Sequence, residues 1–225
     1  MTGQAPQPQP FRIEVVVEAP ADAVWRALTD PQEIRRWFGW DYEGLDAEIR
    51  FIFVDHSTAH GRERLQGDNG QAIEVEPDGP RTVVRVVYPG PLGDASWDDL
   101  YDEVIQGWRT FLHQLRFYLE GHAGQDRRTV FLAGQVVPAK AFAALEEAAP
   151  GATWDLGRHQ RSVAVDRWGG GLVSLVTAQP RDSGQAADGQ LTVTTYGLDD
   201  AAFEQVEASW AAWWDRLARD AGVAG

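Results

Sequence analysis

One long amphipathic segment constrains the fold of this chain more than any other feature. Between residues 98 and 120, apolar side chains recur every three or four positions, the spacing of one face of an α-helix. These positions are Tyr101, Val104, Ile105, Trp108, Phe111, Leu112, Leu115 and Leu119. At 1.5 Å per residue such a helix is about 35 Å long. Its apolar face needs an apolar partner of similar length.

The residues before this helix supply strand patterns. Apolar and polar residues alternate over 11–18, 47–54, 71–76 and 81–88, and a period of two is typical of half-buried strands. Two short helices are expected after the first strand, because Pro20 and Pro31 each stand where a helix can begin. The polar residues 56–70 are expected to be irregular. One strand, two short helices, further strands and a long helix is an uncommon order of elements.

The rest of the chain repeats this order in shortened form. Strands are expected over 129–133, 162–167, 172–178 and 191–196, and helices over 138–148 and from Asp199 onward. The glycines at 169–171 are interpreted as a hairpin turn rather than a phosphate cradle, because no helix starts after them.

The two long helices can be aligned on their apolar stripes. Val104, Trp108, Phe111, Leu112 and Leu115 fall on Val206, Trp210, Trp213, Trp214 and Leu217. One interpretation is an internal duplication, since each helix closes a similar run of elements. The other is that amphipathic helices with acidic first turns resemble one another. The sequence alone leaves both open.

Composition excludes several classes of function. The 225 residues carry a formal net charge of −14, which argues against a nucleic-acid or anionic-membrane partner. The absence of cysteine excludes disulfides, thiolate metal sites and cysteine nucleophiles. No apolar stretch has the length of a membrane helix. Residues 1–10, rich in Gln and Pro, are expected to be a disordered lead without a signal peptide, so we expect a cytoplasmic protein. Arginine far outnumbers the single Lys140, which suggests a GC-rich bacterial gene.

Motifs in the first 120 residues carry a family resemblance. They are Ile13-Glu14-Val15, Ala19-Pro20, Val24-Trp25-Arg26-Ala27-Leu28-Thr29-Asp30-Pro31, Ile34-Arg35-Arg36-Trp37-Phe38-Gly39, and Gly107-Trp108-Arg109 with Leu112, Leu115 and Tyr118-Leu119. This run resembles the activator of heat-shock-protein-90 ATPase homologue family of the START-like, or SRPBCC, superfamily. The resemblance implies an α+β helix-grip fold, in which a curved antiparallel sheet wraps around a long C-terminal helix, often with a ligand cavity between them.

The chain also departs from that family. Gly44-Leu45-Asp46-Ala47 replaces the usual glycine pair before the second strand, and the ten-residue lead leaves no room for the separate chaperone-binding domain of the co-chaperones. The family name is therefore not expected to state the function. We expect a START-like domain over 11–121, a linker over 122–128, and over 129–225 a shorter, degenerate second copy of the helix-grip unit.

Aromatic residues define a candidate ligand site. The cavity between sheet and closing helix would be lined by Trp37, Phe38, Trp40, Tyr42, Phe51, Phe53, Trp108 and Phe111. Apolar walls with few polar groups suit a small hydrophobic ligand. The competing interpretation is that these side chains fill the core, as aromatic stripes usually do. Further polar candidates for orienting a ligand are Arg50, Tyr88, Tyr101 and Arg109.

Catalytic and metal-binding signals are weak. Asp55-His56 with His60 forms a D-H-x-x-x-H pattern in an expected loop, where the spacing assures no shared face, and solvated side chains are the simpler interpretation. No catalytic motif and no pair of carboxylates in an apolar setting stands out, so no catalytic residue, cofactor or metal ligand is assigned.

Three hypotheses for function follow. The first is a protein that binds a small hydrophobic or aromatic molecule without a cofactor. The second is an interaction or chaperone-associated module with a filled core, which docks a partner through its acidic surface or through Trp210, Trp213 and Trp214 of the last helix. The third is a cyclase- or hydrolase-like enzyme, as some START-like relatives are. The sequence names neither a ligand nor an oligomeric state.

Overall fold

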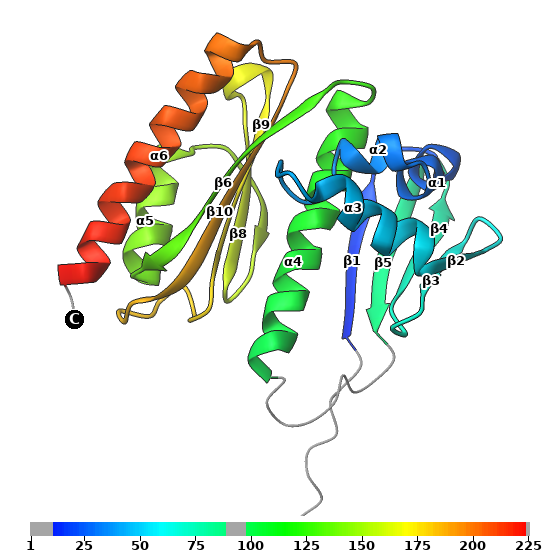
Figure 1. Ribbon diagram of the computed structural model, residues 1–225, viewed down its shortest axis with the longest axis horizontal. Coiled ribbons are helices and arrows are strands. Elements are labelled where there is room, and N and C mark those ends of the chain that lie inside the picture. Colours follow the sequence, from blue (N-terminus) through cyan, green and yellow to red (C-terminus); the bar gives the residue numbers. More distant parts are fainter. Residues whose placement is uncertain (1–10, 89–97, 224–225) are drawn as a thin grey trace, which may run out of the picture.

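The computed structural model describes residues 11–88 and 98–223, and these form two antiparallel five-stranded sheets with helices packed on them (Figure 1). The expected disordered lead, residues 1–10, lies outside the described part of the chain. The expected α+β class is confirmed.

The first sheet has the strand order β1-β5-β4-β3-β2. Its strands are β1 (Phe11–Val17), β2 (Ser57–His60), β3 (Arg64–Gly67), β4 (Ala72–Asp78) and β5 (Arg81–Tyr88). The helices of this half are α1 (Ala21–Thr29), α2 (Pro31–Arg35), α3 (Leu45–Arg50), the π-helix η1 (Phe51–Asp55), α4 (Asp98–Phe117) and the π-helix η3 (Tyr118–His122).

The second sheet has the order β6-β10-β9-β8-β7. Its strands are β6 (Arg127–Val136), β7 (Ala152–Leu156), β8 (Gln160–Val165), β9 (Gly171–Thr177) and β10 (Ala187–Tyr196). The helices are α5 (Pro138–Ala148), the short 3-10 helix η4 (Arg167–Gly169) and α6 (Asp200–Val223). Gly169 and Gly170 lie between the antiparallel strands β8 and β9, and Gly171 begins β9, as a hairpin connection requires.

The two sheets share one topology. In each, the first strand in sequence pairs with the last, and the remaining strands follow in reverse order. Each sheet is also followed by one long helix, α4 or α6. This agreement favours the duplication over a chance likeness of two helices. The second unit has a single helix where the first has α1, α2 and α3, but its described strands are as many as those of the first.

The expected strand over 47–54 is wrong, because these residues form α3 and η1. Leu45, Ile49 and Phe53 are buried at intervals of four, as on a helix face, whereas Phe51 is 58% exposed. A strand would have placed Phe51 and Phe53 on the same face. The amide of His56 donates to the carbonyl of Phe51 at 3.1 Å, an i to i+5 bond that characterises a π-helix.

Two further expectations about strands are corrected. Residues 56–70, expected to be irregular, contain β2 and β3. Strand β7 was not expected, because its residues 152–156 are largely exposed and lack an alternating apolar pattern. All three strands are short or lie at a sheet edge, where pairing with a neighbour rather than an apolar face maintains the strand.

Helix α4 lies between the two sheets (Figure 1). It contacts β1 of the first sheet on one side and β8 and β9 of the second on the other, while α5 and α6 cover the opposite face of the second sheet. The apolar side chains of Trp108, Leu112 and Leu115 lie in the core of the first half. The first half is thus a helix grip whose closing helix is covered on its back by the second half.

The back of α4 carries polar groups, and these pair with the second sheet. Gln114 Nε2 donates to Thr194 Oγ1 at 2.9 Å. Gln160 Nε2 donates to Thr110 Oγ1, also at 2.9 Å. These side chains are buried, and buried amides and hydroxyls need such partners. The face of α4 that the sequence marks as polar is therefore an interface between the halves, not a solvated surface.

His122, which lies at this interface, is expected to make the free energy of unfolding depend on pH. Its buried ring lies 4.6 Å from that of Tyr196 in a stacked arrangement. Burial lowers the pKa of His122 from its ordinary 6.5, and a hydrogen bond with Gln125 opposes the shift in part. Below about pH 6.5 the unfolded chain therefore binds more protons than the folded one, and the free energy of unfolding falls as the pH drops through the lowered pKa.

We expect His122→Phe to reduce this loss of stability. Urea unfolding at about pH 8 and about pH 5.5 measures it, because the shift in midpoint between the two pH values should be smaller in the variant than in the natural protein. An equal shift in both proteins would show that His122 does not contribute.

Candidate functional site

Most of the aromatic residues proposed from the sequence form one packed cluster. Trp37, Phe38, Phe53 and Trp108 are buried, and Phe111 packs against them. The ring of Phe38 lies 5.0 Å from that of Phe53 and 4.6 Å from that of Phe111, centroid to centroid. Such distances are those of aromatic pairs in contact. At this place the aromatic side chains of α4, of η1 and of the segment after α2 pack on one another in the core of the first half.

The other three proposed residues lie elsewhere. Trp40 stacks on Phe131 of β6, with ring centroids 3.9 Å apart. Tyr42 is exposed and donates its hydroxyl to Glu48 at 2.7 Å. Partial desolvation of its hydroxyl, together with the hydrogen bond to Glu48 and the charge of Glu48, raises the pKa of Tyr42 to about 12. Phe51 is exposed on η1. The structure therefore does not bring all eight side chains into one cavity.

The four polar residues proposed to orient a ligand do not gather at one site either. Arg50 pairs with Asp55, Arg109 lies 3.6 Å from Asp155, and Tyr88 is buried on β5. The side chain of Tyr101 lies outside the described part of the structure.

The tryptophans of α6 do not form a surface patch. Trp210, Trp213 and Trp214 are all buried, and they belong to the core between α6 and the second sheet. The hypothesis that these three side chains dock a partner is therefore wrong. They occupy in the second half the place that Trp108 and Phe111 occupy in the first.

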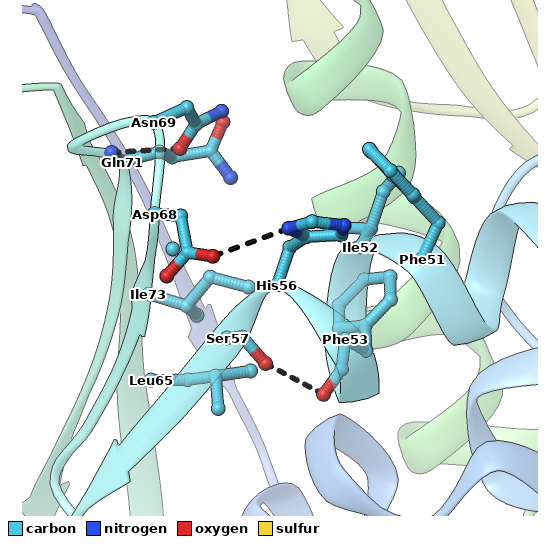
Figure 2. Close-up of a pocket in the computed structure, with 11 residues that line it drawn as sticks. Phe51, Ile52, Phe53, His56, Ser57, Leu65, Asp68, Asn69, Gln71 and Ile73 are labelled. Carbon is cyan, nitrogen blue, oxygen red and sulfur yellow. Dashed lines mark hydrogen bonds and ion pairs between the residues drawn. The ribbon is translucent and has the colours of Figure 1, made fainter.

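A pocket opens beside the aromatic cluster, between η1 and strands β2, β3 and β4 (Figure 2). Its volume is about 150 Å³. Its apolar wall consists of Phe51, Ile52, Phe53, Leu65 and Ile73. A cavity of this order accommodates a single aromatic ring. We call it the η1 pocket.

The strands position the apolar wall. Leu65 on β3 and Ile73 on β4 are paired residues in the antiparallel ladder, so their side chains stand on the same face of the sheet. Both are buried. Phe51 and Phe53, from η1, face them and are the two proposed residues that line the pocket. Sequence reasoning missed Leu65 because it lies in a segment that looked irregular, whereas Ile73 was part of an expected strand.

One polar side chain of the pocket has a defined orientation. Trp108 Nε1 donates to Gln71 Oε1 at 2.9 Å. Because the indole nitrogen is only a donor, this bond directs the Gln71 oxygen to α4 and leaves its amide nitrogen as a donor. Figure 2 shows that nitrogen on the side of His56. Trp108 thus contributes to the pocket through Gln71 rather than by lining it.

The remaining polar groups are His56, Ser57, Asp68 and Asn69. His56 Nδ1 lies 3.1 Å from Asp68 Oδ2, and the amide of Asp68 donates to the His56 carbonyl at 3.0 Å. Ser57 Oγ donates to the Phe53 carbonyl at 2.6 Å, and Asn69 Oδ1 accepts from the Gln71 amide at 3.1 Å. The two bonds between His56 and Asp68 attach the residue that follows η1 to the turn between β3 and β4, whereas the other two bonds are local.

The D-H-x-x-x-H pattern does not assemble. Asp55 pairs with Arg50, His56 with Asp68, and His60 is exposed on β2. Within residues 11–88 and 98–223, no three potential metal-ligating side chains of His, Asp or Glu gather at one point.

A second hollow of about 290 Å³ lies where α2 meets the start of β6. It is lined mostly by charged groups, and its arginines lie near carboxylates. Arg35 Nη1 is 2.6 Å from Asp46, Arg36 Nη1 is 3.0 Å from Glu33, and Arg127 Nη2 is 3.6 Å from Asp41. Burial lowers the pKa of Arg127, and the charge of Asp41 opposes this. Because all of its lining residues are polar or charged, this hollow is a weaker candidate for a hydrophobic ligand than the η1 pocket.

In fold the chain is a tandem of two helix-grip units, as the START-like resemblance implies. It is similar in structure to DynU16, a protein of the dynemicin biosynthetic locus, with 18% identity and a TM-score of 0.36 over 94% of this chain and 97% of that one. It is also similar to the Aha1 dimer from Colwellia psychrerythraea, with 16% identity and a TM-score of 0.40 over 52% of this chain and 100% of that one.

A third similar structure is the di-domain ARO/CYC BexL from the BE-7585A biosynthetic pathway, with 14% identity and a TM-score of 0.37 over 96% of this chain and 95% of that one. The family that the N-terminal motifs resemble is thus represented among these neighbours by Aha1. Sequence identities and TM-scores this low support no inference about the activity of this protein.

No family model matches the sequence, and no curated protein matches it either. In the described part of the chain, no helix has the length and apolar character needed to cross a bilayer.

Proposed function

We propose that this protein binds a small hydrophobic or aromatic molecule in the η1 pocket, with the ring against the apolar wall. The observation that carries the proposal is the pairing of that wall with one oriented donor, Gln71 Nε2, whose direction is set by Trp108. Ligand sites typically combine mostly apolar walls with a few placed polar groups. The site differs from the expected cavity, because only Phe51 and Phe53 of the eight proposed aromatic residues line it, and the rings around Phe38 pack on one another instead.

The shape of η1 also supports a binding role. A π-helix is less favourable than an α-helix and occurs frequently at functional sites. Here it carries Phe51, Ile52 and Phe53 along one side of the pocket. The volume of the pocket restricts the ligand to about one ring.

Filling the pocket is expected to abolish binding. Leu65→Phe adds an aromatic ring where the ligand ring is proposed to lie. We expect saturation-transfer NMR signals of phenol, benzene and indole with the natural protein and their loss with the variant. The added ring costs about 1–3 kcal/mol at a packed site, so the thermal unfolding of the variant is measured alongside.

The matched control is Val16→Phe, which adds a ring at a half-exposed position on β1. It is expected to leave the NMR signals unchanged. The proposal is contradicted if none of the three probes binds the natural protein, or if a folded Leu65→Phe variant binds them as well as the natural protein does.

A further inference from the structure

The η1 pocket has an uneven distribution of charge. Among the residues that line it, Asp68 is the one acidic side chain, and no Lys or Arg lies with it. The nearest arginine on the adjoining helix, Arg50, is paired with Asp55 through Nε and Oδ2 at 3.2 Å. His56, which faces Asp68, is the remaining titratable group of the lining. An anionic ligand would therefore meet a carboxylate and no arginine or lysine.

Some hydrogen-bonding groups of the pocket are already bonded within the protein, and others remain available to a ligand. The Ser57 hydroxyl is used by the Phe53 carbonyl, and the Asn69 oxygen is used by the Gln71 amide. Gln71 Nε2 remains as a donor, and the Asp68 carboxylate, which His56 contacts through one oxygen, remains as an acceptor. The amide nitrogen of Asn69 and Nε2 of His56 also remain in the lining. Asp68 and Gln71 stand near one another on the turn between β3 and β4 (Figure 2).

We infer that the pocket selects a neutral or cationic single-ring molecule that carries a hydroxyl or amino group and an acceptor oxygen, and that it rejects carboxylate analogues. This inference rests on the proposed function. The hydroxyl or amino group donates to Asp68, the acceptor oxygen receives a hydrogen bond from Gln71 Nε2, and the ring packs on Leu65 and Ile73. This arrangement pairs one ligand donor with the Asp68 carboxylate and one ligand acceptor with Gln71 Nε2.

Two ring compounds of nearly equal shape test the inference. 4-Hydroxybenzamide is neutral and 4-hydroxybenzoate is an anion, so they differ mainly in charge. We expect the natural protein to bind the benzoate more weakly by about fivefold or more, because like charges at a partly exposed site repel. Dissociation constants come from NMR titration of the full chain at neutral pH, with 4-hydroxybenzylamine as the cationic member of the series.

Asp68→Asn identifies the source of the selectivity. The substitution keeps the size of the side chain and removes its charge, so the ratio of the two dissociation constants should fall to about twofold or less. Asp78→Asn is the matched control. It removes one negative charge from the turn between β4 and β5, where Asp78 pairs with Arg81 at 2.6 Å, and it should leave the ratio unchanged.

The outcomes separate the two proposals. If neither compound nor the amine binds the natural protein, the proposed function itself fails. If the compounds bind but the natural protein does not discriminate between them, or if Asp68→Asn retains the full preference, the pocket is a ligand site and the inference about charge is overturned.

Discussion

Trp37→Ala is expected to lower the free energy of unfolding by about 4 kcal/mol, the upper range for removing a large aromatic side chain from a core. Trp37 is fully buried, and its ring lies edge-on to those of Phe38 and Phe53, 5.7 and 5.9 Å away. Removing it leaves a void that the neighbouring rings cannot close without losing contact with each other. Urea unfolding followed by circular dichroism measures the loss.

Trp37 also satisfies a backbone carbonyl at the end of α1. Its Nε1 donates to the carbonyl of Ala27 at 2.7 Å. In a continuing helix that carbonyl would accept from the amide four residues later, but the residue there is Pro31, which has no N–H. The indole supplies the missing donor.

Trp37→Phe separates the two contributions. It retains most of the ring and removes the donor, so we expect a loss of about 1–3 kcal/mol, the usual cost of an unsatisfied buried group. If Trp37→Phe costs as much as Trp37→Ala, packing of the indole is not the main contribution and the account given above is wrong.

Arg127→Met is expected to lower the free energy of unfolding by about 3 kcal/mol, since it removes a buried charge and leaves polar partners behind. Arg127, on the first strand of the second half, has a side chain that is 1% exposed. Its Nη1 donates to the carbonyl of Phe38 at 2.8 Å and to that of Gly39 at 3.2 Å, both in the first half. Methionine keeps much of the length and none of these bonds.

Arg128→Met provides a control on the same strand. Arg128 pairs with the exposed Asp200 and lies over the ring of Phe203, 4.1 Å from its centroid. Exposed ion pairs contribute little, so we expect a loss of about 1 kcal/mol or less. Urea unfolding of both variants is the measurement. Equal losses would mean that the bonds of Arg127 to the first half do not stabilise the contact between halves.

Local patterns predicted much of the fold. The apolar stripe of α4, the strand β5 and the helix α5 lie where the sequence placed them, because each has a regular period and a clear boundary residue, such as Pro138 at the start of α5. In the segment 47–54, by contrast, the apolar period fits both a helix and a strand. Ile49 and Phe53 fit a spacing of four as well as a spacing of two, and only the exposure of Phe51 decides between them.

The candidate site was less predictable, because it depends on contacts between distant segments. Five of the eight proposed aromatic residues are neighbours around Phe38, and they pack on one another in the core of the first half. The pocket lies beside them, and its lining includes Leu65 and Gln71, whose partners Ile73 and Trp108 are set by strand register and by the position of α4. Neither relation is visible in a local pattern.

By itself, the sequence determined most of the helices and strands, the order in which they repeat, and the absence of thiol chemistry, because these follow from side-chain type and period. The tertiary structure alone decided that the polar back of α4 is buried, through Gln114 and Thr110, against the second sheet. It also decided that Trp213 and Trp214 are core residues and that the pocket opens at η1. Burial is a property of what packs on a surface, and the residues that cover these side chains come from far along the chain.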